Sequence, residues 1–158
     1  MVTKIGIGQD SHVFEKTPGK PLILAGIKFK SSFGLEGNSD ADVIFHSITN
    51  AISSVTGKNI LGSVADELAN QGKADSSEYL QLALNDLQEW NINHIAISIE
   101  CLKPKILPQI ELMRHKISDI CKINISDVGI TATSGEGLTA FGRGEGIQAI
   151  TIITISKS

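Results

Sequence analysis

Apolar and polar residues along this chain follow strand and helix periods in turn, which predicts a mixed fold. Apolar runs predict strands over residues 2–9, 92–101, 128–133 and 147–155, and a short hairpin of 22–24 and 27–29. Apolar residues at helical spacing predict one helix over 40–55, a second from the cap Asp75 through 90, and a third that Pro108 opens. Residues 57–74 have weak periodicity and several glycines, so we expect a mobile loop that could include one short helical turn.

The last strand is apolar on both of its faces. One face carries Ile147, Ala149, Ile153 and Ile155, and the other carries Ile150 and Ile152. Such a strand must be covered on both sides, and three helices suffice for one face only. We therefore expect an α+β fold in a single domain over residues 1–158, with a mixed four- to five-stranded sheet, helices on one face, and the other face packed against another subunit.

Composition narrows the class of protein. Hydrophobic residues make up 41% of the 158 residues and charged residues 20%, and the net charge of -3 supplies no basic field to attract nucleic acid. No apolar stretch approaches ~18 residues, so no membrane span is expected. The chain starts almost directly with strand residues, and its two cysteines, Cys101 and Cys121, are sparse. We expect no signal or transit peptide, idle or buried thiols, and a cytoplasmic protein.

Asp10, His12 and His46 form the most informative pattern for chemistry. Residues two apart in a strand point to the same face, so Asp10 and His12 project together while Ser11 turns away. One carboxylate and two imidazoles can hold a divalent metal and leave a coordination position open for a substrate oxygen, which points to catalysis. Taken one by one, each piece is also compatible with an ordinary packed or solvated side chain.

His46 is expected two turns into the first helix, which Ser39 or Asp40 would cap. Asp42 and Asn50 lie one helical turn away on either side of it, and either could orient the imidazole. The remaining histidines, His94 and His115, have no acidic or histidine neighbours at ligand spacing, so we expect structural or surface roles for them.

A Gly-rich segment at 131–146 offers groups suited to phosphate. Thr133, Ser134 and Gly135 can present hydroxyls and free backbone N–H groups to phosphate oxygens, and Glu136 is a hard ligand suited to Mg²⁺. Arg143 offers bidentate anion recognition. The alternative is a plain Gly-rich hairpin. The lysines of the segment 103–108 are likewise compatible with a solvated loop at a helix entry.

Four motifs occur in one order along the chain: G-x-D-x-H at 8–12, S-D-x-D-x-x-x-H at 39–46, K-P-K-I-L-P at 103–108 and G-R-G-E-G at 142–146. In that order they resemble the 2-C-methyl-D-erythritol 2,4-cyclodiphosphate synthase family of the non-mevalonate isoprenoid pathway. The resemblance extends from Ile5 to about Ile155. Each motif is weak alone, but four in register are specific.

The resemblance implies a reaction without a protein nucleophile. In 4-diphosphocytidyl-2-C-methyl-D-erythritol 2-phosphate, the 2-phosphate attacks the β-phosphorus, releases CMP and closes a cyclic diphosphate. The enzyme then has to hold a near-attack geometry and neutralise charge on phosphorus. The family is a homotrimer with active sites between adjacent subunits.

The resemblance also implies roles for individual residues. Asp10, His12 and His46 would hold Zn²⁺, and Glu136 would hold Mg²⁺ or Mn²⁺. Asn38, Thr133 and Ser134 would be catalytic, contacting the phosphates and stabilising the transition state. Cys101 to Leu107 would bind the cytidine end of the substrate, with Lys105 close to its phosphates, and Arg143 would lie near a further anion site. The full set expected to bind substrate is Asp10, Ser11, His12, Asn38, Ser39, Ile60, Leu61, Gly62, Asp66, Cys101, Pro104, Lys105, Ile106, Leu107, Thr133, Ser134, Gly135, Glu136 and Arg143.

The chain departs from the family pattern around the predicted pocket. Asn38 stands where many members have His, so it keeps a donor but cannot carry a positive charge. Residues 59–62 lack the acid of a common D-I-G, and in 64–68 only Asp66 matches an acid. Ala140, beside Phe141, replaces a Phe near the anion site. These changes affect the methylerythritol contacts and any isoprenoid effector site on the trimer axis, and they leave the metal triad intact.

Two other functions are compatible with these features. A catalytically silent homologue would bind cytidine nucleotides without forming a cyclic product, and the altered segment 57–70 favours it. A zinc-dependent phosphoesterase would use bound hydroxide and yield a linear product.

Overall fold

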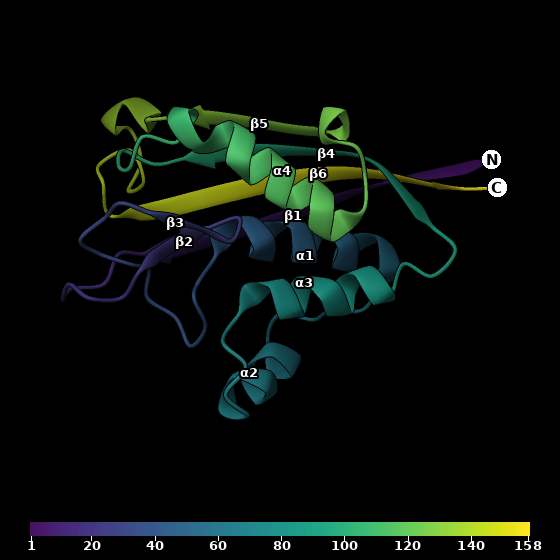
Figure 1. Ribbon diagram of the computed structural model, residues 1–158, viewed down its shortest axis with the longest axis horizontal. Coiled ribbons are helices and arrows are strands. Elements are labelled where there is room, and N and C mark those ends of the chain that lie inside the picture. The colour runs from purple at the N-terminus through teal and green to yellow at the C-terminus, as the bar shows by residue number, and fades with distance from the viewer.

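One four-stranded sheet organises the computed structural model, which describes all 158 residues (Figure 1). The strand order is β1-β6-β4-β5, where the strands are β1 (Val2–Val13), β4 (Asn91–Glu100), β5 (Val128–Thr133) and β6 (Gly146–Lys157). β6 pairs antiparallel with β1 and β4, and β4 pairs parallel with β5. The hairpin of β2 (Leu22–Leu24) and β3 (Ile27–Phe29) forms a separate small sheet. The predicted mixed sheet is confirmed.

The helices pack on one side of this sheet. They are α1 (Val43–Thr56), α2 (Ser63–Asn70), α3 (Ser76–Asn85) and α4 (Ile110–Cys121), with short 3-10 turns η1 (Leu107–Gln109), η2 (Ile125–Asp127) and η3 (Gly135–Gly137). α1 lies against β1 and β6, α4 lies against β5, and α3 packs on α1 (Figure 1). α2 lies farthest from the sheet (Figure 1).

Four predicted elements were wrong in extent. The first helix begins at Val43 rather than at residue 40. β1 continues to Val13 rather than ending at 9, because every residue from Val2 onward pairs with β6. Residues 57–74 contain the two-turn helix α2, where we expected a loop with at most one short helical turn, and no side chain of this helix is fully buried. α3 stops at Asn85 rather than 90, and Gln88 in the following turn has a left-handed φ of 51°.

The two faces of the sheet differ in cover. The helix-facing side contributes Ile95, Ile97 and Ile99 of β4 to the hydrophobic core, as the alternation predicts. On the opposite side Ile5, Ile7 and Ile152 are 71%, 61% and 44% exposed. Helices therefore cover one face of the sheet only, and the other face presents apolar side chains.

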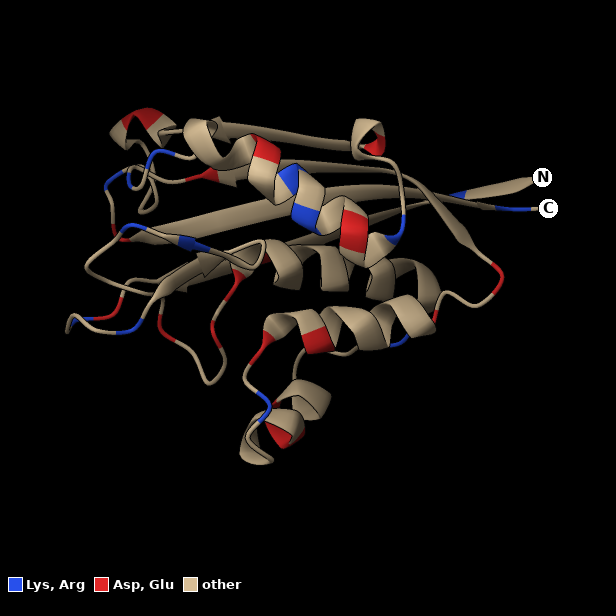
Figure 2. Ribbon diagram, viewed as in Figure 1, with Lys and Arg blue, Asp and Glu red and all other residues tan.

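The surface carries mixed charge. Acidic and basic residues both occur along α4 (Figure 2), and the net charge of the chain is -3. None of the helices combines the length and apolar character needed to cross a membrane.

Candidate metal centre

The predicted triad comes together where β1 meets α1. Asp10 and His12 pair with Ala149 and Ile147 of β6 and share the helix-facing side of the sheet, while Ser11 points to the other side. His46 lies in the first turn of α1 rather than two turns in, because the helix begins at Val43. Asp10 and His12 thus reach His46 across the contact between strand and helix.

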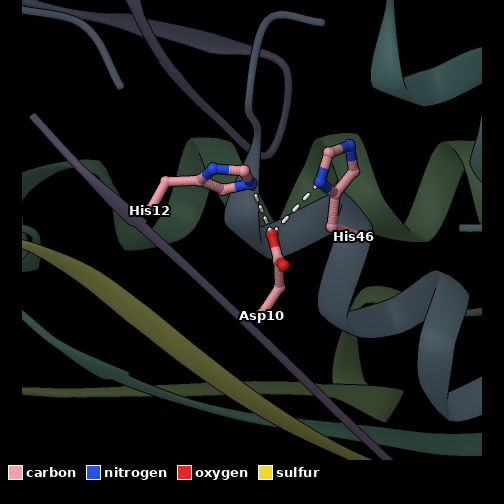
Figure 3. A group of neighbouring side chains, drawn as sticks. All are labelled: Asp10, His12 and His46. Atoms are coloured by element: carbon pink, nitrogen blue, oxygen red, sulfur yellow. Dashed lines mark hydrogen bonds and ion pairs between the residues drawn. The ribbon is translucent and has the colours of Figure 1, made fainter. Parts of the chain in front are cut away.

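The three side chains converge on a single point (Figure 3). Asp10 Oδ2 lies 3.1 Å from His12 Nε2 and 3.1 Å from His46 Nδ1. One ligand atom from each residue lies within 4.8 Å of the other two. In a tetrahedral zinc site with ordinary bond lengths, ligand atoms are separated by roughly 3.3 Å. The oxygen and two nitrogens therefore fit a divalent cation with small adjustments, and the predicted convergence is confirmed.

The electrostatics of the triad favour a charged carboxylate. Burial of Asp10 opposes its ionisation, but hydrogen bonds from His12 and His46 and the charges of both rings hold the pKa of Asp10 below its ordinary value. The hydrogen bond to Asp10 raises the pKa of His12 against the opposing effect of burial. Asp10 is thus held as an anion between two imidazoles, and an ionised carboxylate is one of the ligands that a divalent cation takes.

Asn50 and Asp42, which were expected to orient His46, make their side-chain hydrogen bonds to other partners. Asn50 donates from Nδ2 to the carbonyl oxygen of Gln9. Asp42, and neither Ser39 nor Asp40, is the N-cap of α1 and accepts from the N–H groups of Ile44 and Phe45. The Asp42 carboxylate also accepts from the N–H groups of Ala25 and Gly26, so it connects the β2–β3 turn to α1 and makes no hydrogen bond to the His46 ring.

Ser76, at the first position of α3, is the neighbour of His46 that the sequence analysis missed. Its hydroxyl oxygen lies 2.8 Å from His46 Nε2, and the hydroxyl donates to Asp40. In the sequence Ser76 follows the capping residue Asp75, and a capping pattern assigns a role to Asp75 only. Asp75 does cap α3, as predicted, by accepting from the N–H of Ser77.

A cavity of about 320 Å³ opens beside the triad. Its lining includes, of the residues predicted to bind substrate, Asp10, His12, Asn38, Ser39, Leu61, Gly62 and Asp66, together with the metal residue His46. Gly37, Ala65, Ala69 and Tyr79 complete the lining. Ile60 is buried in the core and is absent from the lining. α2 thus forms one wall of the cavity, since Ala65, Asp66 and Ala69 belong to this helix.

The residues predicted to bind the cytidine end and the diphosphate, which follow β4 and β5, form a second group that lies apart from this cavity. Thr133, Ser134 and Glu136 are exposed at the end of β5, where Ser134 Oγ accepts from the N–H of Glu136 and Gly135 N donates to Thr133. The segment from Cys101 to Leu107 follows the neighbouring strand, and Cys101 N donates to the carbonyl oxygen of Thr133.

Side chains within this second group differ in exposure. Cys101 and Ile106 are buried, Pro104 is partly buried, and Lys105 and Leu107 are exposed. Arg143 is paired with Glu145, with Nε 3.0 Å from the carboxylate. The structure therefore places Lys105 and Glu136 as free charges near the ends of β4 and β5.

The triad and Thr133 occupy opposite faces and opposite edges of the sheet. Asp10 shares its face with Ala149 and Ile99, whereas Thr133 pairs with Glu100 on the other face. β1 and β5 are the two edge strands, and three strand spacings, roughly 14 Å, separate them. Within one chain the two groups therefore face different directions.

Comparison with known proteins identifies the family of the chain. The YgbB family model matches residues 3–156. A relative from Chlamydia abortus, named 2-C-methyl-D-erythritol 2,4-cyclodiphosphate synthase, is 52% identical over 159 residues, covering 99% of this chain and 90% of the relative.

Two solved structures are similar in fold. The bifunctional IspDF from Campylobacter jejuni has a TM-score of 0.89 at 27% identity, over 99% of this chain and 43% of that one. A 2C-methyl-D-erythritol-2,4-cyclodiphosphate synthase in a form bound to CDP has a TM-score of 0.83 at 26% identity, over 97% of this chain and 100% of that one.

Proposed function

This chain belongs to the YgbB family, and on that premise we propose how its residues carry out the reaction of 2-C-methyl-D-erythritol 2,4-cyclodiphosphate synthases. The chain is a lyase of the non-mevalonate isoprenoid pathway. It converts 4-diphosphocytidyl-2-C-methyl-D-erythritol 2-phosphate to the cyclic diphosphate and CMP. A bond forms between an oxygen of the 2-phosphate and the β-phosphorus, and the bond from the β-phosphorus to the oxygen of the departing CMP breaks.

The convergence of Asp10, His12 and His46 on one point carries the proposal for the site. A cavity lined by Asp10 and Asp66 would repel a diphosphate, so its use requires a cation held by the triad. The ligand set of two imidazoles and one carboxylate suits Zn²⁺. A divalent cation bound there would supply Lewis-acid neutralisation of negative charge on a diphosphate oxygen.

The methylerythritol end of the substrate occupies the cavity beside the triad. Asn38 and Ser39 line it and present an amide and a hydroxyl to the substrate phosphates. Asp66, on α2, presents a carboxylate that accepts from sugar hydroxyls. These groups orient the 2-phosphate toward the β-phosphorus, which is the main requirement of an intramolecular reaction.

The cytidine end binds at the segments that follow β4 and β5. The backbone from Cys101 to Leu107 presents peptide groups to the cytosine edge, and Lys105 neutralises phosphate charge. Thr133 and Ser134 donate hydroxyl hydrogen bonds to the diphosphate, and Glu136 would hold Mg²⁺ or Mn²⁺. The protein side chains here bind and position; none acts as a nucleophile.

A complete active site needs two copies of the chain. The triad and Thr133 lie on opposite faces of the sheet, so one substrate molecule cannot contact both within one chain. The uncovered face, with Ile5, Ile7 and Ile152 exposed, supplies an apolar surface that a second copy would bury. A closed ring of three copies, each joining its triad to the next copy's β5 end, satisfies both requirements.

A turnover assay tests this function. The purified protein is incubated with the diphosphocytidyl substrate and Mg²⁺, and the products are identified by mass. Equimolar CMP and cyclic diphosphate are expected, and addition of a chelator that strips the triad should stop the reaction. A linear diphosphate would overturn the proposed mechanism, since it requires water as the nucleophile.

A further inference from the structure

His46 is held through both of its ring nitrogens. Nδ1 faces Asp10 Oδ2 at 3.1 Å, and Nε2 faces the hydroxyl oxygen of Ser76 at 2.8 Å. Ser76 is fully buried and His46 is 7% exposed. No side chain of α1 other than His46 takes part in these contacts. The orientation of the ring is therefore fixed by β1 on one side and by the start of α3 on the other.

Asp40 fixes the hydroxyl of Ser76. Asp40 Oδ1 accepts from the hydroxyl of Ser76 and, at 3.1 Å, from the N–H of Asp42. Asp40 Oδ2 accepts from the N–H of Ser76 at 3.1 Å. Both carboxylate oxygens are thus engaged, and both hold Ser76. These hydrogen bonds fix the Ser76 hydroxyl independently of His46.

The protons available in these hydrogen bonds determine which ring nitrogen of His46 is protonated. A serine hydroxyl has one proton to donate, and here it goes to Asp40. The Ser76 oxygen can then only accept from His46, so Nε2 must carry the proton. Nδ1 faces Asp10, to which it donates when no cation is bound. It is therefore the nitrogen that gives up its proton when a divalent cation binds between the three side chains, since metal binding releases protons from its ligands.

We propose that Ser76, held by Asp40, is a positioning residue that fixes His46 in its Nε2–H tautomer and so keeps Nδ1 available to the cation. This role rests on the proposed metal centre and extends it beyond the three ligands. Partners of this kind orient metal-binding histidines, and their loss costs roughly 10–100-fold in metal affinity. Because Ser76 is buried, solvent cannot readily supply a substitute acceptor.

Zinc affinity of the purified full chain, measured by competition with a chelator, tests the role. Ser76→Ala removes the acceptor and should weaken zinc binding by roughly 10–100-fold. Asp40→Ala leaves the serine hydroxyl free to donate to Nε2, which would put the proton on Nδ1, so it should weaken binding to a similar degree. The matched control is Ser77→Ala, one residue along α3, whose hydroxyl contacts neither His46 nor Asp40. Circular dichroism establishes that each variant is folded.

Nitrogen NMR of His46 in the zinc-bound wild type supplies a second readout that needs no variant. A protonated Nε2 is expected, and an unprotonated Nε2 would overturn the proposal. Zinc affinity of folded Ser76→Ala within twofold of wild type would overturn it as well. A wild type that binds no zinc would instead refute the metal centre itself, and the positioning role with it.

Discussion

Gly8 of β1 lies directly against Ser47 of α1. A Cβ added to Gly8 would sit 2.1 Å from the carbonyl oxygen of Ser47, and one added to Gly6 would sit 2.4 Å from that of Ala51. Since these are backbone atoms, the strand and helix can approach this closely only without side chains on the strand. This approach brings His46, next to Ser47, within reach of Asp10.

Gly8→Ala should separate the strand from the helix. Overpacking of this kind costs about 3 kcal/mol, and we expect a loss of that order in the free energy of unfolding, measured by urea denaturation. Zinc affinity should fall in the same variant because His46 moves away from Asp10. Gly129→Ala is the matched control, since its Cβ would make only an ordinary 3.7 Å contact with His94. Wild-type stability of Gly8→Ala would contradict the packing described.

His46→Ala should abolish tight zinc binding while leaving the chain folded. The loss of a direct ligand should exceed the roughly 100-fold effect of removing a residue that only orients a ligand. Turnover should disappear with the metal. Isothermal titration with zinc and a CMP-release assay measure the two effects, with the exposed His115→Ala as control. Substantial activity of His46→Ala without zinc would refute the role of the triad.

Asp42 should make stability depend on pH. Burial raises the pKa of Asp42 to about 7, although the N–H groups of Gly26, Ala25 and Phe45 act to lower it. Between its ordinary value of 3.8 and about 7, the folded state holds a proton that the unfolded state has lost. The stability that this proton supplies is complete below 3.8 and is lost as pH rises through about 7.

Comparison with Asp42→Asn isolates this effect. The amide does not titrate, so the difference in urea midpoint between wild type and variant should shrink as pH rises from 4 to 8. The variant should be less stable overall, because an amide cannot accept all four backbone N–H groups that the carboxylate accepts. A constant difference across this range would show that Asp42 titrates normally.

The sequence predicted those parts of the fold in which local pattern and tertiary packing agree. β4 alternates because Ile95, Ile97 and Ile99 face the core, and the core-facing stripe of α1 is strong for the same reason. The extent of α2 was underestimated because the helix has only 8 residues and none of its side chains is fully buried, so its few apolar residues, among them Ala65 and Leu68, make a short pattern. The triad was predictable because two of its members share one strand at the spacing of two residues.

The partner of His46 could not be predicted from periodicity. Helical spacing identifies only neighbours on the same helix, and it selected Asp42 and Asn50. Ser76 lies 30 residues away and reaches His46 through the packing of α3 on α1. The N-cap of α1 was ambiguous for a related reason. Three capping residues lie within 39–42, and Asp42 is the one that can also accept from the distant turn at Ala25 and Gly26.

Both cysteines should be unreactive in the folded protein. Burial raises the pKa of Cys101 to about 11 and that of Cys121 to about 12, so very little of the reactive thiolate is present at pH 8. A disulfide reagent such as DTNB should react slowly with the native chain and rapidly with both thiols in guanidinium chloride. Fast reaction of either thiol in the native protein would show that its surroundings open to solvent.

Complementation between two inactive variants tests whether active sites form between copies. His46→Ala disables the triad, and Glu136→Ala disables the group at the end of β5. If each site joins the triad of one copy to the β5 end of the next, mixed rings contain sites in which both halves are intact. Random mixing of equal amounts should restore about a quarter of wild-type activity in a closed ring, because each half is intact with a chance of about one half.

The mixture requires conditions that allow subunits to exchange. Unfolding the two variants together and refolding them provides this, and each variant refolded alone is the control. CMP release measures the recovered activity, and a second pair, His12→Ala with Ser134→Ala, repeats the test with different residues from the same two groups. Activity that stays at the level of the separate variants would mean that both groups serve one substrate within a single chain. That outcome would require the β5 end to move to the other face of the sheet, against the register of β4 with β5 and β6.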